Sequence, residues 1–144
     1  VVDSSAIPTG EIASVEGTPM DFRTEKQIGH DIRADFEQLH FTGGYDHNYV
    51  LGRPGEKKIM ANAYCRESGI ALEAETDCCG VQFYAGNFIG EQTGKGGAAY
   101  HDRSAFCLES QFYPNAVNEP DFPSPVVKAG HTYHTETSYR FYLR

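Results

Sequence analysis

The chain has 144 residues, and its 12 Lys and Arg against 20 Asp and Glu give a formal net charge of -8 at pH 7. This length suits one domain with a hydrophobic core of its own and is too short for two domains of ordinary size. Because the acidic charge repels phosphate backbones and anionic lipid surfaces, we expect neither nucleic acid nor a membrane as a partner.

No stretch approaches the ~20 apolar residues of a membrane span, and no signal-peptide pattern opens the sequence. The sequence contains four cysteines, namely Cys65, Cys78, Cys79 and Cys107. They form no C-x-x-C pair, so their spacing favours neither a zinc ribbon nor a disulfide framework. We therefore expect reduced thiols and a cytoplasmic location.

Turn residues dominate the beginning of the chain. Residues 1–23 carry Pro and Gly at close intervals, which predicts loop and sheet-edge structure. Ile32, Phe36 and Leu39 then have the spacing of a short amphipathic helix over residues 31–39, whose first residue is the candidate cap.

The rest of the chain alternates short apolar runs with turn residues. A Gly-Gly pair leads into the first run, and the predicted strands after it cover residues 58–65, 70–76, 81–84, 105–108 and 132–143. The connection between the first two of these has hairpin length and ends in Gly69, which can take the left-handed conformation. Short strands, frequent turns and almost no helix predict an all-β sandwich or barrel.

A glycine-rich stretch at residues 90–97, GEQTGKGG, has some features of a phosphate-binding loop. It is one residue too short between the glycines, and no Ser or Thr follows Lys95 to bind a magnesium ion. A surface loop at the rim or lid of a site is the better interpretation.

Polar side chains accompany three of the apolar runs. In GGYDHNYVL, residues 43–51, the local interpretation is a Gly-Gly turn capped by Asp46, with His47 bonded to a backbone group. Gln82 lies among aromatic residues and is either a satisfied core amide or a ligand hydrogen-bonder. Glu109 follows an apolar run, where burial raises a carboxyl pKa toward that of a general base; otherwise it faces water at a strand end.

An acid, an amide and a carboxylate beside aromatic rings are typical of a sugar pocket, because rings cover the apolar sugar face and planar polar groups bind its hydroxyls. Five stretches stand in order over nearly the whole chain, namely TPMDFR at 18–23, GGYDHN at 43–48, GVQFYAGNF at 80–88, FCLESQ at 106–111 and TSYRF at 137–141. They resemble the successive motifs of the aldose 1-epimerase (galactose mutarotase) family.

The resemblance implies an all-β, galactose mutarotase-like β-sandwich (supersandwich), with residues 1–144 as the C-terminal portion of a single domain. It implies that Glu109 is the general base, and that Asp46 and Gln82 hydrogen-bond sugar hydroxyls. The implied reaction interconverts the α and β anomers of a free aldohexose such as galactose or glucose, and it requires no metal or organic cofactor.

Two departures from the family motifs are visible, and neither removes the chemistry. Ser110 stands where Thr is usual, and Cys79 stands where Pro commonly precedes the GVQFY glycine. Two other interpretations stay open. A non-catalytic carbohydrate-binding or interaction module of the same fold would only bind sugar, whereas a glycoside hydrolase would use Asp46 and Glu109 as paired carboxylates.

Members of the family are more than twice as long as this chain, and the resemblance begins in their second half, at residues 7–11. No stretch here matches the upstream histidine that the family uses as general acid, in an N-H-x-Y/W-x-N-L type motif, or its upstream arginine. We therefore expect the chain alone to be inactive and poorly behaved, and to require an N-terminal segment as its partner.

Overall fold

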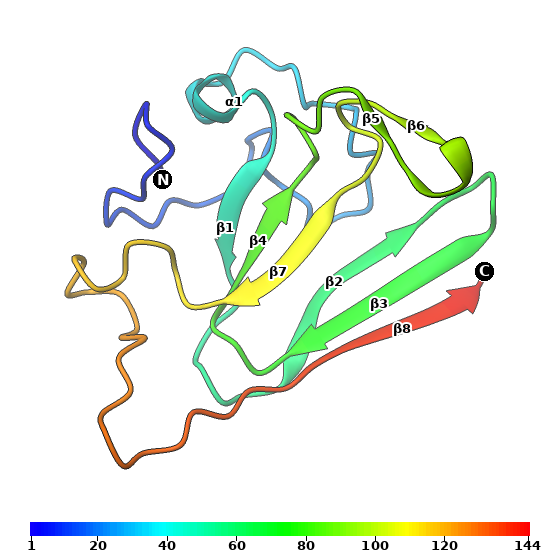
Figure 1. The fold of residues 1–144 in the computed structure, drawn as a ribbon. Coiled ribbons are helices and arrows are strands. Elements are labelled where there is room, and N and C mark those ends of the chain that lie inside the picture. Colours follow the sequence, from blue (N-terminus) through cyan, green and yellow to red (C-terminus); the bar gives the residue numbers. More distant parts are fainter. The chain divides into compact units, whose positions relative to one another are not determined.

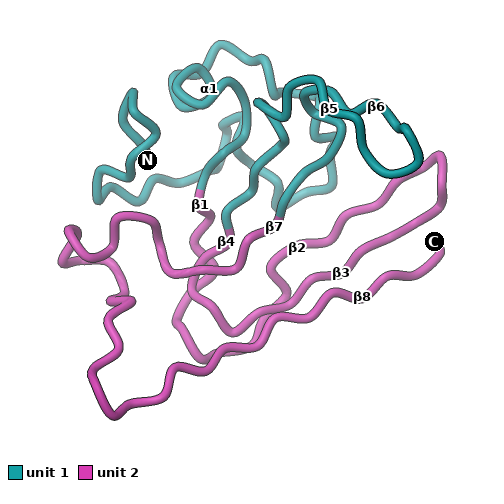
Figure 2. Tube along the Cα trace, viewed as in Figure 1, with its two compact units in different colours: residues 1–47, 82–107 teal, residues 48–81, 108–144 magenta.

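The computed structural model describes all 144 residues, and they form two compact units. Unit 1 contains residues 1–47 and 82–107, and unit 2 contains residues 48–81 and 108–144 (Figure 2). Each unit therefore combines two stretches of chain that are far apart in the sequence.

The predicted site residues belong to a three-stranded sheet with the order β1-β4-β7. Its strands are β1 (Asp46–Val50), β4 (Gly80–Tyr84) and β7 (Cys107–Gln111). The chain passes from one unit to the other inside each of these strands. Unit 1 also holds the helix α1 (Glu37–Thr42), the short strands β5 (Gln92–Thr93) and β6 (Ala99–Tyr100), and the single turn η1 (Lys95–Gly97) between them.

Unit 2 contains a second three-stranded sheet with the order β2-β3-β8 (Figure 1). Its strands are β2 (Lys58–Tyr64), β3 (Ile70–Thr76) and β8 (Thr137–Leu143). Strand β3 is antiparallel to both neighbours. The predicted hairpin between β2 and β3 is confirmed, and Gly69 has the expected left-handed φ of 70°. The nearly all-β architecture with very little helix is confirmed as well.

The predicted alternation along β3 is confirmed only in part. Ala74 and Thr76 are fully buried, as expected, but Ile70 is 49% exposed and Ala71 is buried on the opposite face. The size of the side chains explains the difference. An alanine side chain lies close to the backbone, so neighbouring residues cover it more easily than they cover an isoleucine side chain at the end of the strand.

The helix prediction is wrong in its bounds. The helix begins at Glu37 rather than at residue 31, and Phe36 before it is extended. Asp31 does not cap it, because its carboxylate is bonded by Lys26 at 2.8 Å and by His30 at 2.7 Å. The helix ends at Thr42, and Gly43 caps it with a φ of 66°, a conformation that favours glycine after a helix C-terminus.

Two strand predictions are also shifted. Strand β8 begins at Thr137 rather than at residue 132, and the two residues just before it are bonded by the side chain of Asp77. The Asp77 carboxylate accepts hydrogen bonds from the Thr135 hydroxyl and from the Glu136 backbone N–H. Strand β7 begins at Cys107 rather than at residue 105, so that Glu109 lies in the middle of the strand and not at its end.

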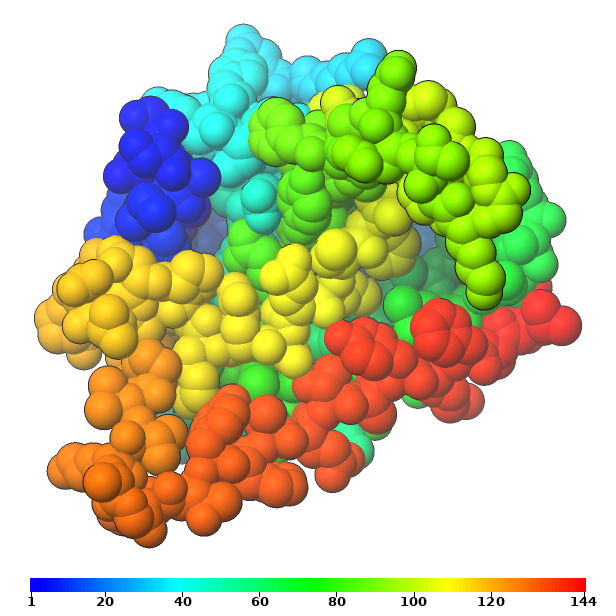
Figure 3. Space-filling view, in the orientation of Figure 1, coloured from blue at the N-terminus to red at the C-terminus, as the bar shows by residue number.

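Each unit has its own apolar packing. In unit 1 the packing is aromatic and joins the rings of Phe22, Tyr45 and Phe83. In unit 2 two buried clusters form, one of Met60, Ala74 and Val81 and another of Cys79, Tyr113, Ala116 and Phe122. By contrast, Phe141 and Leu143 on β8 are 67% and 80% exposed, and Figure 3 shows this C-terminal segment, in red, at the surface.

The glycine at the start of β4 supplies a direct test of the packing in unit 2. A Cβ atom on Gly80 would lie 2.5 Å from Asn48 Oδ1 and 3.0 Å from Tyr113 Cδ1. We predict that Gly80→Ala lowers the free energy of unfolding by about 1–3 kcal/mol, the usual cost of overpacking. The matched control is Gly29→Ala, where an added Cβ meets nothing within 4 Å. Urea denaturation of both variants checks this, and equal stabilities would contradict it.

Candidate functional site

An aromatic cluster in unit 1 orients the residues at the entrance of β1 and in β4. The Phe22 ring meets the Tyr45 and Phe83 rings edge-on, with centroids 5.0 and 5.4 Å apart, and Tyr45 stacks on Phe83 at 5.4 Å. Successive side chains of a strand point to opposite faces. Burial of Tyr45 and Phe83 therefore turns Asp46 and Gln82, the adjacent residues, to the other face.

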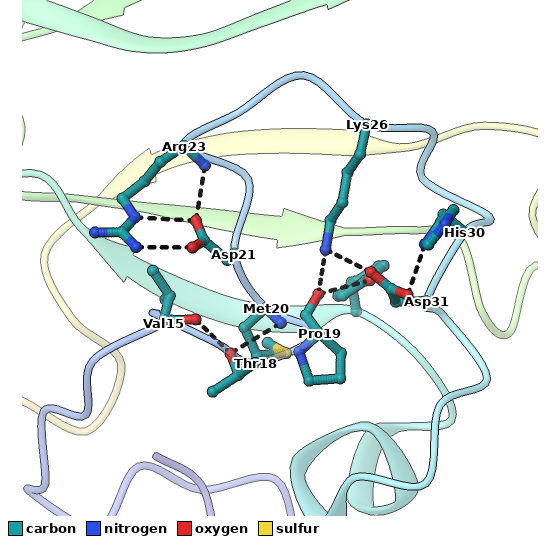
Figure 4. A network of polar contacts seen from close by, with 10 residues as sticks. Val15, Thr18, Pro19, Met20, Asp21, Arg23, Lys26, His30 and Asp31 are labelled. Carbon is teal, nitrogen blue, oxygen red and sulfur yellow. Dashed lines mark hydrogen bonds and ion pairs between the residues drawn. The ribbon is translucent and has the colours of Figure 1, made fainter.

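A polar network that includes Pro19, Lys26 and Asp31 lies at the Tyr45 end of this cluster, and Figure 4 shows these three residues. The Tyr45 hydroxyl donates to the Pro19 carbonyl at 3.0 Å, and Lys26 Nζ donates to the same oxygen at 2.7 Å. Lys26 also pairs with Asp31 and lies 4.4 Å from the centroid of the Phe22 ring. Burial raises the pKa of Tyr45 to about 12, so the hydroxyl stays protonated and remains a donor at physiological pH.

A second ion pair in the same segment lies at the surface. Arg23 bonds the Asp21 carboxylate through Nε at 3.0 Å and Nη2 at 2.8 Å (Figure 4). These hydrogen bonds lower the pKa of Asp21 to about 2. Because the Arg23 side chain is 60% exposed, this pair orders the loop locally and adds little to stability.

Asp46 and Gln82 form a side-chain pair. Gln82 Nε2 donates to Asp46 Oδ1 at 2.8 Å, and both residues are half-buried. The interpretation of Asp46 as a turn cap is wrong, because its carboxylate bonds Gln82 and the glycine turn is held by other groups. Gly44 N donates to the Leu39 carbonyl, and the Thr42 hydroxyl donates to the Gly44 carbonyl.

His47 lies on the buried face of β1 and is only 7% exposed. Its Nδ1 accepts the Asp46 backbone N–H at 3.2 Å, which confirms the predicted bond to a backbone group. Burial lowers the pKa of His47 to about 4, so the imidazole is neutral at physiological pH. A buried, neutral side chain on the face opposite Asp46 does not act as an acid on a ligand bound by Asp46.

Glu109 belongs to unit 2 and is exposed, so of the two interpretations of this residue the one in which its carboxylate faces water is confirmed for these 144 residues. Its neighbours on β7 are anchored toward β8. The Tyr139 hydroxyl donates to the Leu108 carbonyl at 2.9 Å, and the Ser110 and Thr137 hydroxyls are 2.7 Å apart. Ser110, the residue that departs from the family motif, therefore uses its hydroxyl to tie β7 to β8.

The sequence interpretation missed a second polar pair. Gln111 Nε2 donates to Asn48 Oδ1 at 3.1 Å within unit 2. Asn48 follows Asp46 by two residues on β1, and Gln111 follows Glu109 by two on β7. The period of two along a strand was the signal that could have found them.

The four cysteines are free, with Cys78 and Cys79 buried and Cys65 and Cys107 exposed, which confirms the expected unpaired thiols. Two depressions are present, of about 360 Å³ in unit 1 and about 300 Å³ in unit 2. Neither is lined by Asp46, Gln82 or Glu109. No group of three or more His, Cys, Asp or Glu side chains is arranged to hold a metal ion. None of the helices combines the length and apolarity that crossing a membrane needs.

Comparisons with known proteins agree with this fold and these motifs. A family model described as aldose 1-epimerase matches residues 1–140. Galactose mutarotase of Sus scrofa is 44% identical over 141 residues, which are 97% of this chain and 40% of the relative. Aldose 1-epimerase of Escherichia coli (strain K12) is 36% identical over 143 residues, which are 97% of this chain and 41% of the relative.

The crystal structure of a GalM/aldose epimerase homologue from C. elegans is also similar, with a TM-score of 0.77 and 29% identity. It covers 99% of this chain, which in turn covers 42% of that protein. The fold is thus that of the galactose mutarotase-like β proteins. The chain belongs to the aldose 1-epimerase family, and it spans about two fifths of the length of the curated relatives that it matches.

The network around Tyr45 gives a stability prediction. Lys26→Met removes the bond to the Pro19 carbonyl, the ion pair with Asp31 and the cation–π contact with the Phe22 ring, so we expect a loss of about 1 kcal/mol or more in the free energy of unfolding. The matched control is Arg23→Met, which breaks the exposed pair with Asp21 and should leave stability within the error of measurement. Thermal denaturation compares the two, and an equal effect would show that Lys26 is not part of the packing.

Proposed function

We propose that this chain carries the sugar-binding and base-bearing part of an aldose 1-epimerase that interconverts the α and β anomers of free aldohexoses such as galactose and glucose. One observation carries the proposal: the 2.8 Å bond from Gln82 to Asp46, which orders an amide and a carboxylate from two neighbouring strands of the sheet. Such planar groups bind adjacent sugar hydroxyls, and the match to the family over residues 1–140 supports this use.

In the proposed reaction Glu109 removes the proton of the anomeric hydroxyl while a general acid protonates the ring oxygen. The bond between C1 and the ring oxygen breaks, and C1 becomes the carbon of an aldehyde. Rotation about the C1–C2 bond and closure with the reverse proton transfers give the other anomer. The base and the acid each typically contribute 10²–10⁴-fold to the rate.

The proposal includes an acid from outside these 144 residues. Neither Asp46 nor His47 suits that role, because Asp46 is committed to Gln82 and His47 is buried and neutral. The family resemblance assigns the acid to a histidine upstream of the part matched here. We therefore propose that residues 1–144 are the C-terminal portion of a single domain and work with an N-terminal segment. A cytoplasmic location is part of the proposal, supported by the four free cysteines.

A binding module of the same fold and a glycoside hydrolase remain the alternatives, and one set of assays separates them. Polarimetry on pure α-galactose detects mutarotation, whereas a reducing-sugar assay on an oligosaccharide detects cleavage. Binding of galactose without either signal would favour the module. The assays are run on the 144 residues alone and with the upstream segment joined to them. Brisk mutarotation by the 144 residues alone would contradict the need for that segment.

Substitution of Glu109 tests the base. Glu109→Gln is nearly isosteric and lies on an exposed position, so we expect an unchanged fold and nearly unchanged galactose binding. We predict that kcat falls by about 10²–10⁴-fold, the usual cost of losing a general base. Polarimetry on the protein with its upstream segment measures this. The control is Glu67→Gln in the β2–β3 connection, and a Glu109→Gln variant with control-like activity would exclude Glu109 as the base.

Asp46 should respond differently. Asp46→Asn keeps the shape of the side chain but removes a charged acceptor, so we predict a loss of about 1–3 kcal/mol in galactose binding with the far-UV circular dichroism unchanged. Isothermal titration with galactose measures the affinity, and thermal denaturation follows the stability. If the melting temperature collapses together with the sheet signal, Asp46 has a structural role and the binding assignment fails.

A further inference from the structure

The peptide group between Tyr45 and Asp46 is held from both of its ends. Its carbonyl oxygen, which belongs to Tyr45, accepts one hydrogen bond from Ala85 N at 2.9 Å and another from Asn87 Nδ2 at 3.0 Å. Its N–H, which belongs to Asp46, donates to His47 Nδ1 at 3.2 Å. The direction in which the Asp46 side chain leaves the backbone depends on this peptide plane, because the plane sets φ of Asp46.

His47 provides the acceptor for the N–H side of this peptide. Its Nδ1 can accept only when it carries no proton, so a neutral ring has its proton on Nε2. Nε2 is buried without a hydrogen bond of ordinary geometry, the Gln38 backbone lies near enough to the ring to act on its pKa, and the whole residue is 7% exposed.

Beyond this peptide lies the pair that the proposed function uses. Asp46 Oδ1 accepts Gln82 Nε2 at 2.8 Å, so a rotation of the peptide would move the carboxylate away from the amide or strain that bond. A hydrogen-bonded binding group loses much of its effect when it is displaced by about 1 Å.

We propose that His47 is a positioning residue, whose Nδ1 fixes the Asp46 peptide and thereby holds the Asp46 carboxylate against Gln82 in the geometry that binds a sugar hydroxyl. The part of this proposal that concerns sugar rests on the proposed function. The part that concerns the Asp46–Gln82 pair rests on the contacts of unit 1 alone. The neutrality needed for Nδ1 to accept is supplied by burial, which lowers the pKa of His47 to about 4.

Two near-isosteric variants separate positioning from simple packing. In His47→Asn the side-chain Oδ1 can stand where Nδ1 stood and accept the Asp46 N–H, whereas His47→Leu has no acceptor. In the protein with its upstream segment, we expect His47→Asn to keep the wild-type KM for galactose within about twofold. We expect His47→Leu to raise KM roughly three- to tenfold with little change in kcat, the effect of one lost hydrogen bond on ground-state binding. His101→Leu, at an exposed histidine, is the control.

A packing role predicts the opposite order, because leucine suits a buried site better than asparagine. The free energy of unfolding of each variant is measured alongside KM. If His47→Leu binds galactose as tightly as wild type, or if His47→Asn binds as weakly as His47→Leu, the proposal is wrong. Should His47→Leu fail to fold, His47→Gln replaces it, since its oxygen reaches the position of Nε2 rather than that of Nδ1.

A second measurement keeps the test independent of sugar. The side-chain NH₂ resonances of Gln82 report the bond to Asp46 and can be followed by NMR on the 144 residues or on the longer protein. They should shift in His47→Leu and stay in place in His47→Asn and His101→Leu. If wild type neither binds nor converts galactose, the proposed function fails while the Gln82 resonances still decide whether His47 positions Asp46. Unchanged Gln82 resonances in a folded His47→Leu variant would overturn the positioning role.

Discussion

The alternation of side chains at Tyr45-Asp46-His47 and at Gln82-Phe83 is the constraint on which the candidate site depends. Burying the Tyr45 and Phe83 rings against Phe22 fixes which face of each strand is apolar. The period of two then leaves Asp46 and Gln82 on the opposite face, where they meet at 2.8 Å. A slip of one residue in either strand would bury the acid or the amide and expose a ring, so the core and the site specify the same register.

The polar contacts around this core follow from the same arrangement. Tyr45 is buried, so its hydroxyl requires a partner, which is the Pro19 carbonyl. Lys26 reaches the same carbonyl and Asp31, and this use of Asp31 explains why no helix starts there. The TPMDFR segment thus supports β1 from the loop that precedes it, without itself forming a regular element.

Short-range patterns predicted much of the fold. The β2–β3 hairpin, β1 and β4 were predictable because a turn residue such as Gly69 and an apolar run mark them directly. The start of β8 was not, because the two residues just before it are bonded by the side chain of Asp77, a contact that only tertiary structure shows. To predict the Asp46–Gln82 contact one must know that β1 pairs with β4, because the two residues are 36 positions apart in the sequence. The motifs implied this pairing only through the family resemblance.

Asp46 in unit 1 and Glu109 in unit 2 stand in different surroundings, and this bears on the roles proposed for them. Asp46 is half-buried and already accepts a hydrogen bond, which suits the binding role proposed for it. Glu109 is exposed on a strand whose neighbouring residues are tied to β8 by Tyr139 and Thr137. Its position is therefore fixed while its carboxylate stays hydrated. Removal of water makes a carboxylate a better proton acceptor, so a base at this position would become effective when substrate and further protein cover it. Under the proposed function, the activity of Glu109 should therefore depend on what covers it, whereas the Asp46–Gln82 pair is complete within unit 1.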